Sequence, residues 1–547
     1  MTATDDRTPE GLDAGSSRRL FLARLAALSA AGATGATVLP GVAQAAPAPA
    51  SSAPDVAASA AELADPASLT VGQAATAIRG GRLTSQALVR ACIERIAAHD
   101  GTYRAFNTVL ADEALARAKQ LDRRRPKSPL HGIPLAIKDN YFTEGVLTTA
   151  NSFIFADFVP PYDATAVARL EGAGGVVVGK TQMGPLATSR ATTPAGVVTT
   201  LNAWAPANPD ISPAGSSSGS ATATAVGMAL SSIGTQTGGS ITGPAEAQGL
   251  TGLKPTMGRV SLHGIIPLTY TRDHPGPIAR DAMDAAIMLT AMAGPDPSDF
   301  RTLGLPALPD LVRAATPVRR GGTTALRRRT RIGVQPDFLA VEGEVLAARQ
   351  AYLAQLASIP GATVVEVPFP DEWELLTGSA FNNVRLPERA EPFLPWLKED
   401  LRLFGVSVLA WLGGLVLSGD EYLKGQRAKT VLFERTMDQV FEACDVVVQT
   451  GPVPFDILGL PEIAFPIGFT AAAGSTPALP VGTILGGQPY AEDRLLEVVA
   501  AYQAVTDWHT RRAPLPPTGR AEARRAPAER SAGTLRLDAL EAARQAQ

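Results

Sequence analysis

The sequence contains little cysteine and little histidine. Its 547 residues include two cysteines, Cys92 and Cys444, and five histidines. So few cysteines exclude a disulfide-stapled scaffold, and no Cys/His spacing predicts a zinc site. Both cysteines stand among apolar residues, and we expect each to be a small buried hydrophobic side chain. The sequence leaves open whether they pair.

The sequence also lacks an excess of charge of one sign. Lys and Arg number 49 against 52 Asp and Glu, which gives a formal net charge of -3. Such a chain has no basic field of the kind that holds nucleic acid, so no nucleic-acid partner is predicted. One group of arginines, between Arg319 and Arg331, is interpreted as a solvated connection rather than an anion site or a partner site.

Long hydrophobic runs are scarce, and an uncharged, Ala-rich stretch, Leu25–Leu39, lies near the start of the chain. It follows Arg18-Arg19 and precedes the small-residue site Ala43-Gln44-Ala45, an order typical of a twin-arginine signal peptide. The stretch is shorter than the roughly 20 apolar residues that span a membrane. We therefore predict a signal peptide over residues 1–45, a secreted or extracytoplasmic protein, and no stable membrane insertion after cleavage.

The rest of the chain has an ordinary globular composition, 45% hydrophobic and 18% charged. Ala, Pro and Ser dominate residues 46–67, which predicts a disordered linker. Residues 68–510 alternate short apolar runs with helical patterns, as expected of one large α/β domain. Residues 511–547 are rich in Arg, Ala and Pro and predict a loose tail, apart from a short helical pattern near 537–545. The elements expected within the domain are strands at 133–137, 175–178, 264–266, 331–334 and 363–367, and helices at 221–230, 281–293 and 341–358.

Three segments carry residues of the types that take part in catalysis. An apolar run ends at Lys138, although a lysine at a strand end usually reaches solvent. The stretch Pro213–Ala223 (PAGSSSGSATA) has linker-like composition, yet it fits the G-x-S-x-G nucleophile pattern with Ser217 at its centre. The segment Gly234–Ser240 (GTQTGGS) ends in a Thr-Gly-Gly-Ser turn. Its consecutive backbone N–H groups suit an oxyanion, or it is a plain tight turn.

Taken together, these segments resemble the amidase signature family. Further stretches with the same resemblance run in order along residues 68–510. They are GRLTS at 81–85, GKTQM at 179–183, GLKPTMGRVS at 252–261, a GPIAR turn at 276–280, GLP at 459–461 and LPVG at 479–482. The resemblance implies a single large domain with a central mixed β-sheet covered by helices.

The resemblance also implies an amidohydrolase with a Ser-cisSer-Lys triad. Motif matching makes Lys138 the base, Ser216 the proton relay and Ser240 the nucleophile, with a cis peptide bond on one side of Ser216. A lysine can act as a base only when it is neutral, so its pKa must lie well below about 10.4. The expected substrates are a small amide and water, with no metal or cofactor. The oxyanion would be held by the backbone N–H groups of Thr237, Gly238, Gly239 and Ser240.

Several positions depart from the family pattern. Thr242 and Gln236 stand where many members have Arg and Asp, and Asp456 stands where Asn is common; Gln182–Pro185 also differs. From these changes we expect a neutral or apolar substrate. Aromatic residues of the region 377–417 line an acyl pocket or are plain core, and the sequence leaves both open. They are Phe381, Phe393, Trp396, Phe404 and Trp411.

Two other functions compete with the amidase. The first is an α/β-hydrolase-type esterase that uses Ser217, although no apolar strand precedes this serine and no histidine is marked as its partner. The second is a catalytically inactive, exported binding protein, which the intact lysine and serines argue against. An amidotransferase subunit does not suit an exported chain. The sequence does not name the amide or the oligomeric state.

Overall fold

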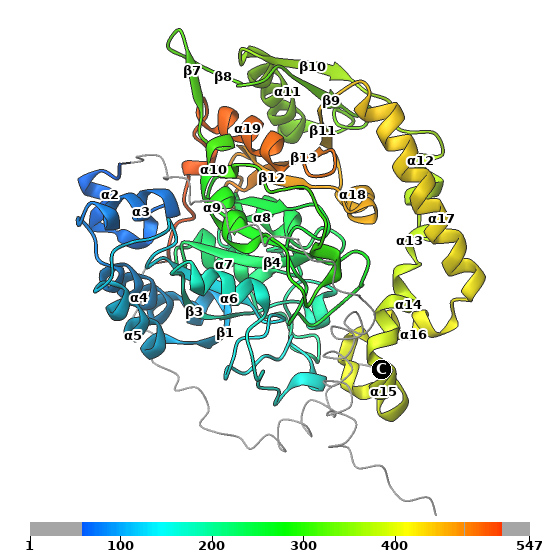
Figure 1. Ribbon diagram of the computed structural model, residues 1–547, viewed down its shortest axis with the longest axis horizontal. Helices are drawn as coiled ribbons and strands as arrows, with labels where there is room; N and C mark the ends of the chain where they lie inside the picture. The colour runs from blue at the N-terminus through cyan, green and yellow to red at the C-terminus, as the bar shows by residue number, and fades with distance from the viewer. Residues whose placement is uncertain (1–56, 475, 517–547) are drawn as a thin grey trace, which may run out of the picture.

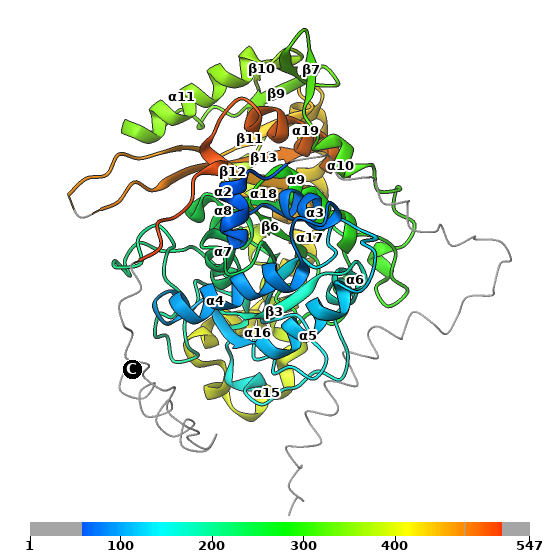
Figure 2. The same ribbon diagram turned by 90° about the vertical axis from the view of Figure 1, so that its left-hand side faces the viewer.

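The computed structural model describes residues 57–474 and 476–516. The predicted signal peptide and the helical pattern near 537–545 lie outside these residues. The described chain folds around one large mixed sheet with helices on both faces (Figures 1 and 2). This architecture confirms the predicted α/β domain.

The sheet has eleven strands in the order β1-β3-β2-β4-β6-β5-β12-β13-β11-β9-β10. Strand β2 lies between β3 and β4 and is parallel to both, and β9 is parallel to β10 and β11. The other pairs of the sheet are antiparallel. A separate hairpin, β7–β8, projects at the edge of the molecule (Figure 1). The strands are β1 Phe106–Val109, β2 Pro134–Lys138, β3 Val176–Thr181, β4 Ser231–Gln236, β5 Thr251–Lys254, β6 His274–Ala279, β7 Val318–Arg320, β8 Thr323–Ala325, β9 Thr330–Val334, β10 Ala362–Glu366, β11 Val446–Gln449, β12 Glu462–Phe469 and β13 Pro480–Gly487.

Helices cover the sheet, and those between α12 and α17 gather along one side of the molecule (yellow in Figure 1). The α-helices are α2 Ala60–Ala64, α3 Val71–Arg79, α4 Ser85–Tyr103, α5 Ala111–Leu121, α6 Thr165–Gly172, α7 Ser218–Ala225, α8 Thr242–Gln248, α9 Ala282–Met292, α10 Leu311–Ala314, α11 Gly343–Ser358, α12 Trp373–Thr377, α13 Ser379–Asn382, α14 Arg385–Ala390, α15 Leu394–Glu399, α16 Val408–Val416, α17 Gly419–Arg435, α18 Val453–Leu458 and α19 Glu492–Gln503. Shorter helical turns are η1 Pro66–Ser68, η2 Phe153–Phe155, η3 Pro185–Ala187, η4 Phe300–Thr302, η5 Glu391–Phe393, η6 Leu401–Ser407, η7 Thr436–Phe441 and η8 Trp508–Thr510.

Strand β2 is buried on both faces, so its side chains enter two different parts of the core. Leu135 and Ile137 pack in the cluster that contains α9, whereas Ala136 packs in the cluster that contains Ala221 of α7. A strand covered on both faces reads as a continuous apolar run, which is why the sequence predicts it well. The burial extends to its last residue, Lys138, whose side chain has no exposed area.

Two elements differ from the prediction because of long-range pairing. The GPIAR segment expected as a turn belongs to strand β6, where Pro275 and Pro277 face Thr235 and Ile233 of β4. Proline forms no backbone N–H bond, but the neighbouring residues complete the ladder. The run 264–266 is not a strand, since Ile265 makes only an isolated bridge to Tyr141.

The prediction of a disordered linker is wrong for the last residues of 46–67. Helix α2 begins after Ser59, whose side chain and Glu62 form a capping box. Ala67 is fully buried, and its carbonyl accepts a hydrogen bond from Arg280 at 2.8 Å. This segment is therefore packed against the domain.

The predicted loose tail is likewise packed where it is described. The Arg511 guanidinium lies over the rings of Trp508 and Phe469, 4.3 and 4.9 Å from their centroids. Ala513 is buried, and the Pro514 carbonyl accepts a hydrogen bond from Tyr103 at 3.4 Å. Residues 511–516 thus continue the folded domain.

Cys92 and Cys444 are both buried free thiols in different core clusters, so they do not pair. Their burial confirms the expectation of small hydrophobic residues. In the part of the chain that the structure describes, no single helix is long and apolar enough to cross a membrane; one bent pair, Leu401–Val416 with Gly419–Phe441, meets the test of length and composition.

Candidate active site

Lys138 ends strand β2 inside the protein rather than in solvent. Its Nζ donates to Ser216 Oγ at 2.8 Å, to Thr235 Oγ1 at 2.8 Å and to the Thr235 carbonyl at 3.2 Å. Asn140 donates to the same Thr235 hydroxyl at 3.1 Å. Burial lowers the pKa of Lys138 to about 7, against an opposing effect of the Asp273 carboxylate. The amine is therefore positioned and tuned to exchange a proton near neutral pH.

Ser216 is buried and lies just before α7. The peptide bond between Gly215 and Ser216 is cis, and this is one of the two bonds that the sequence singled out. The Ser216 carbonyl accepts a hydrogen bond from the Gly184 N–H at 3.1 Å. A side chain on Gly215 has no room, because its Cβ would lie 2.4 Å from the Ser189 carbonyl oxygen.

Ser240 stands at the end of the turn that follows β4. Thr235 of this strand accepts a hydrogen bond from the Lys138 amine, and the strand ends one residue later, at Gln236. Ser240 is 9% exposed, more than Ser216 at 1%. Its hydroxyl forms no hydrogen bond with another residue in 57–474 or 476–516. Lys138 is therefore bonded directly to Ser216 but not, through Ser216, to Ser240.

The glycine turn offers fewer oxyanion donors than the sequence predicts. The Gly239 N–H donates to Asp456 Oδ2 at 2.9 Å, so the prediction is wrong for this residue. The N–H groups of Thr237, Gly238 and Ser240 have no acceptor among the described residues. Gly239 has φ of 88°, a conformation that favours glycine and turns the chain here.

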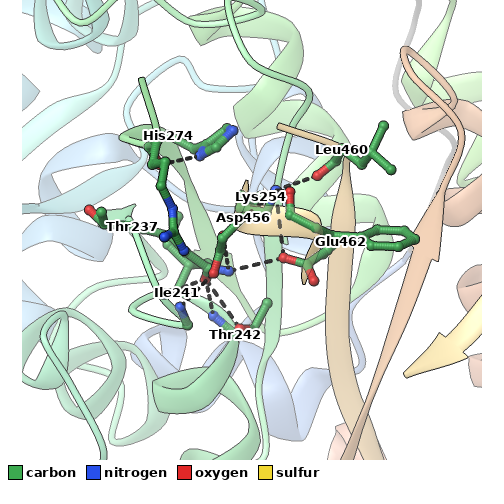
Figure 3. A network of polar contacts seen from close by, with 12 residues as sticks. Thr237, Ile241, Thr242, Lys254, His274, Asp456, Leu460 and Glu462 are labelled. Carbon is green, nitrogen blue, oxygen red and sulfur yellow. Dashed lines mark hydrogen bonds and ion pairs between the residues drawn. The ribbon is translucent and has the colours of Figure 1, made fainter. Parts of the chain in front are cut away.

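Three of the four departures from the family pattern, Gln236, Thr242 and Asp456, meet in one buried network beneath the turn (Figure 3). Gln236 Oε1 accepts from the N–H groups of Ile241 and Thr242 at 2.8 and 2.9 Å and from the Thr242 hydroxyl at 3.2 Å. Its amide nitrogen donates to Asp456 at 3.0 Å and to Glu462 at 3.1 Å. One neutral side chain therefore ties the start of α8 to two buried carboxylates.

Lys254 supplies the positive charge of this network. Its Nζ lies 3.8 Å from Asp456 Oδ1 and 3.5 Å from Glu462 Oε2, and it donates to the Leu460 carbonyl. Burial raises the pKa of Asp456 and of Glu462, and Lys254 opposes both shifts. A polar network thus supports the turn, although three of its residues, Gln236, Thr242 and Asp456, differ from those the family usually has.

The other residues around the lysine have structural tasks. Asp139 lies 3.3 Å from Lys180 Nζ and accepts hydrogen bonds from Asn107 at 2.8 Å and from the Thr149 hydroxyl at 2.6 Å. Sequence reasoning missed Thr235 and Asp273 as neighbours of Lys138. Thr235 carries a weak signal, since it lies near the end of β4, two residues before Thr237; Asp273, which accepts a hydrogen bond from Thr237, carries none.

The esterase alternative finds no support in this geometry. Ser217 has no exposed area, and its hydroxyl donates to the Thr235 carbonyl at 3.5 Å. No strand precedes it between β3 and α7, and no histidine in the described residues is bonded to it. A nucleophile elbow requires both features.

Most of the aromatic residues for which the sequence left an acyl pocket or plain core open are core. Phe393 contacts Trp396, Phe404 and Trp411, with ring centroids 5.7 to 6.2 Å apart, and all four rings are buried. Phe381 packs in a separate cluster. Within the described ranges, no group of three or more His, Cys, Asp or Glu side chains is placed to hold a metal ion.

A buried lysine bonded to a serine on a cis peptide, beside a glycine turn that ends in a second serine, defines a serine-hydrolase type of site on an α/β fold. The amidase family matches residues 87–452. The chain is 38% identical over 497 residues to a glutamyl-tRNA(Gln) amidotransferase subunit of Chloroflexus aggregans, covering 81% of this chain and 98% of the relative. It is 37% identical over 492 residues to the protein of the same name from Roseiflexus sp., covering 82% and 98%.

Among solved structures, the native peptide amidase from Stenotrophomonas maltophilia is similar with a TM-score of 0.68 and 29% identity, covering 82% of this chain and 98% of that one. The chain therefore belongs to the amidase family, and it is an amidase-signature amidohydrolase that acts on C–N bonds.

Proposed function

We propose that this chain hydrolyses a linear carboxamide through a serine acyl-enzyme, with Ser240 as nucleophile, Ser216 as proton relay and Lys138 as base. The observation that carries the proposal is the 2.8 Å contact between Lys138 Nζ and Ser216 Oγ, made by a lysine whose burial lowers its pKa to about 7. A hydroxyl is a weak nucleophile until a base removes its proton, and this lysine is available as that base.

The contacts of Lys138 suit a neutral amine as well as an ammonium. When neutral, the amine keeps two N–H bonds, to the Thr235 carbonyl and hydroxyl, and turns its lone pair to Ser216 Oγ. The Ser216 hydroxyl then donates to the lysine and accepts the proton of Ser240, since a hydroxyl does both. The proton path runs from Ser240 through Ser216 to Lys138.

The reaction follows in two halves. Ser240 Oγ attacks the amide carbon, and its proton moves to Ser216 while the Ser216 proton moves to Lys138. As the C–N bond breaks, the leaving nitrogen takes a proton back through Ser216, which leaves an ester on Ser240. Water then attacks this ester with the same proton path, releasing the acid and restoring the serine.

The oxyanion is assigned to the N–H groups of Thr237, Gly238 and Ser240, because the Gly239 N–H is bonded to Asp456. Fixed backbone donors stabilise the developing negative charge without reorganising. Asp456 acts here as a positioning residue that holds the turn.

The test is an activity screen of the purified chain on fatty, aryl and peptide amides, with Ser240→Ala as the control. Turnover that Ser240→Ala abolishes supports the proposal. Hydrolysis that persists in Ser240→Ala, or a complete lack of hydrolysis and of fluorophosphonate labelling, contradicts it; the second result favours the inactive binding protein.

A second candidate function is that of an amidotransferase subunit, which the identity to the Chloroflexus and Roseiflexus proteins supports. The two candidates differ in their dependence on other chains. A free-standing amidohydrolase turns over amides alone and purifies without partners from its source. Activity that appears only with further subunits favours the amidotransferase.

Export remains a proposal that rests on the sequence of residues 1–45. Mass spectrometry of protein recovered outside the cytoplasm tests it. A mature N-terminus near Ala46 supports export by the twin-arginine signal, and an intact N-terminus on protein from the medium contradicts it.

A further inference from the structure

Three buried or half-buried arginines lie together beside the glycine turn. Arg272 precedes β6, and Arg385 and Arg389 lie one helical turn apart on α14. Arg272 and Arg389 are 3% and 7% exposed, and Arg385 is half-buried. Charged side chains are seldom buried unless they are paired, so each of these guanidinium groups is expected to have a partner.

The protein leaves most of their N–H groups unbonded. Arg272 donates to the Asn382 side chain, but its buried Nε and Nη2 have no partner in the described residues. The Nε atoms of Arg385 and Arg389 are buried and likewise unpartnered there. Arg389 instead lies over the Trp411 ring, 5.4 Å from its centroid.

The nearby carboxylates act on Arg272 from a distance and raise its pKa, but their hydrogen bonds run to other groups. Glu388 accepts from Thr271 and Tyr422, both at 2.9 Å, and Asp273 accepts from the Leu268 N–H at 2.8 Å. Asp456 is paired with Lys254. Within residues 57–474 and 476–516, none of them lies within 4.0 Å of a guanidinium nitrogen of the three arginines.

Burial and mutual repulsion act on the same residues. Burial, the largest cause, lowers the pKa of Arg272 and of Arg389 to about 10. Arg385 adds to both pKa shifts, whereas Asp456 opposes the shift of Arg272 and Asp273 opposes both. A buried cluster of cations that is only partly compensated is costly to the folded protein. An anion that binds among the arginines would remove much of that cost.

The cluster reaches the candidate oxyanion donors. Arg385 Nη1 lies 4.0 Å from the position of a Cβ on Gly238, two residues before Ser240. Arg272 is followed by Asp273, which accepts a hydrogen bond from Thr237 of the same turn. An anion held by the arginines is therefore a short tether from the bond that Ser240 attacks.

We propose that the substrate is an amide whose acyl part carries a carboxylate, and that Arg272, Arg385 and Arg389 bind this carboxylate. The inference rests on the proposed function for the place of the reacting bond. Planar guanidinium groups match a carboxylate with paired N–H donors, which a neutral chain end cannot use. The proposed carboxylate-bearing amide replaces the neutral or apolar substrate expected from the departures at Gln236 and Thr242.

The test measures binding separately from catalysis, by calorimetry on Ser240→Ala. The ligands are succinamate, glutaramate and adipamate, each compared with the neutral amide in which an isopropyl group replaces the carboxylate. We expect the best of the three acids to bind at least about 30-fold more tightly than its isostere, as charge-assisted hydrogen bonds predict. Equal or weaker binding of all three acids overturns the inference.

Variants of the cluster make the test specific. Arg385→Gln in the Ser240→Ala background weakens binding of the acid at least about 10-fold and leaves the neutral isostere within about twofold, whereas Arg385→Lys loses less. Arg402→Gln is the matched control, because Arg402 is exposed and paired with Asp400 at 2.8 Å. Equal weakening of both ligands by Arg385→Gln indicates a structural role and overturns the inference.

The two proposals fail differently. Selective binding of an acid by Ser240→Ala, with no amide hydrolysis by the intact chain, leaves the carboxylate site standing and contradicts the proposed function. Hydrolysis of neutral amides with kcat/KM equal to that of the acids supports the function and overturns the carboxylate site.

Discussion

At the scale of residues, the properties of Lys138 come from its place rather than its type. An exposed lysine keeps a pKa near 10.4 and is charged at neutral pH. Here the side chain has no exposed area, and burial lowers its pKa to about 7. The same burial that the apolar strand β2 requires thus makes the lysine a usable base.

This pKa predicts the acid side of the pH profile. The neutral form of Lys138 is the base, and it is lost as pH falls through about 7. We expect kcat/KM to fall about tenfold for each pH unit well below that value. A profile that stays flat down to pH 5, measured where the protein remains folded, contradicts the assignment.

A change at Asp273 should shift the acid limb of the pH profile, which is the pH range in which kcat/KM falls. Its carboxylate raises the pKa of Lys138, in opposition to burial. Asp273→Asn removes this effect and shifts the acid limb of kcat/KM to lower pH. Asp420→Asn, on the exposed helix α17, serves as the control and leaves the limb in place; a shift to higher pH in Asp273→Asn is the opposite of the expected result.

At the scale of elements, local sequence patterns predicted some strands and helices, whereas a strand that depends on long-range pairing was missed. Strand β2 and helix α9 were predicted from the sequence because continuous apolar runs and capped helical patterns are local signals. Strand β6 was not, because Pro275, Gly276 and Pro277 locally favour a turn, and only pairing with β4 and β5 makes them a strand.

The candidate site shows the same division. Lys138, Ser216 and Ser240 lie in recognisable motifs, so the sequence could single them out. Asp273 and the three arginines come from segments without a motif, and their positions follow only from how α14 and the residues before β6 fold over the turn. The bonded Gly239 N–H was equally out of reach, because its partner Asp456 is 217 residues away.

Helix α7 provides a packing test. Gly219 lies so close to the residues that flank β1 and β3 that a Cβ would be 2.4 Å from the Ala105 carbonyl oxygen and 2.6 Å from that of Gln182. Gly219→Ala should destabilise the fold by about 1–3 kcal/mol in urea unfolding, despite the better helix propensity of alanine. Gly101→Ala in α4, where a Cβ meets nothing within 4 Å, should instead be neutral or stabilising.

The network that joins β5, α18 and β12 provides a second test at this scale. Lys254→Met leaves Asp456 and Glu462 buried without their cation. We expect a loss of about 3–5 kcal/mol in the free energy of unfolding. Lys424→Met, which breaks an exposed pair with Asp420, should have little effect; equal effects of the two changes would show that the buried network is not stabilising.

At the scale of the whole molecule, the segment before α3 completes the fold. Arg280 is buried and donates to the carbonyls of Ala67 and Leu69, and Gln73 donates to Glu62 at 2.8 Å. A chain that begins at Ala46 keeps these contacts, whereas one that begins at Thr70 leaves Arg280 without its acceptors.

This difference predicts the outcome of truncation. The chain that begins at Ala46 should have the Tm of the full chain, and the chain that begins at Thr70 should have a lower one, because a buried guanidinium loses its hydrogen bonds. Calorimetric melting of the two chains decides the matter. Equal Tm values would mean that residues 59–69 do not contribute to stability.

The central claim is that Ser240 is the nucleophile and that Lys138 activates it through Ser216. The most direct measurement is fluorophosphonate labelling followed by peptide mapping, in the wild type and in Ser240→Ala, Ser216→Ala and Ser217→Ala. We expect a label on Ser240 that Ser240→Ala abolishes, Ser216→Ala slows and Ser217→Ala leaves unchanged. A label that survives in Ser240→Ala, or that maps to Ser217, would contradict it.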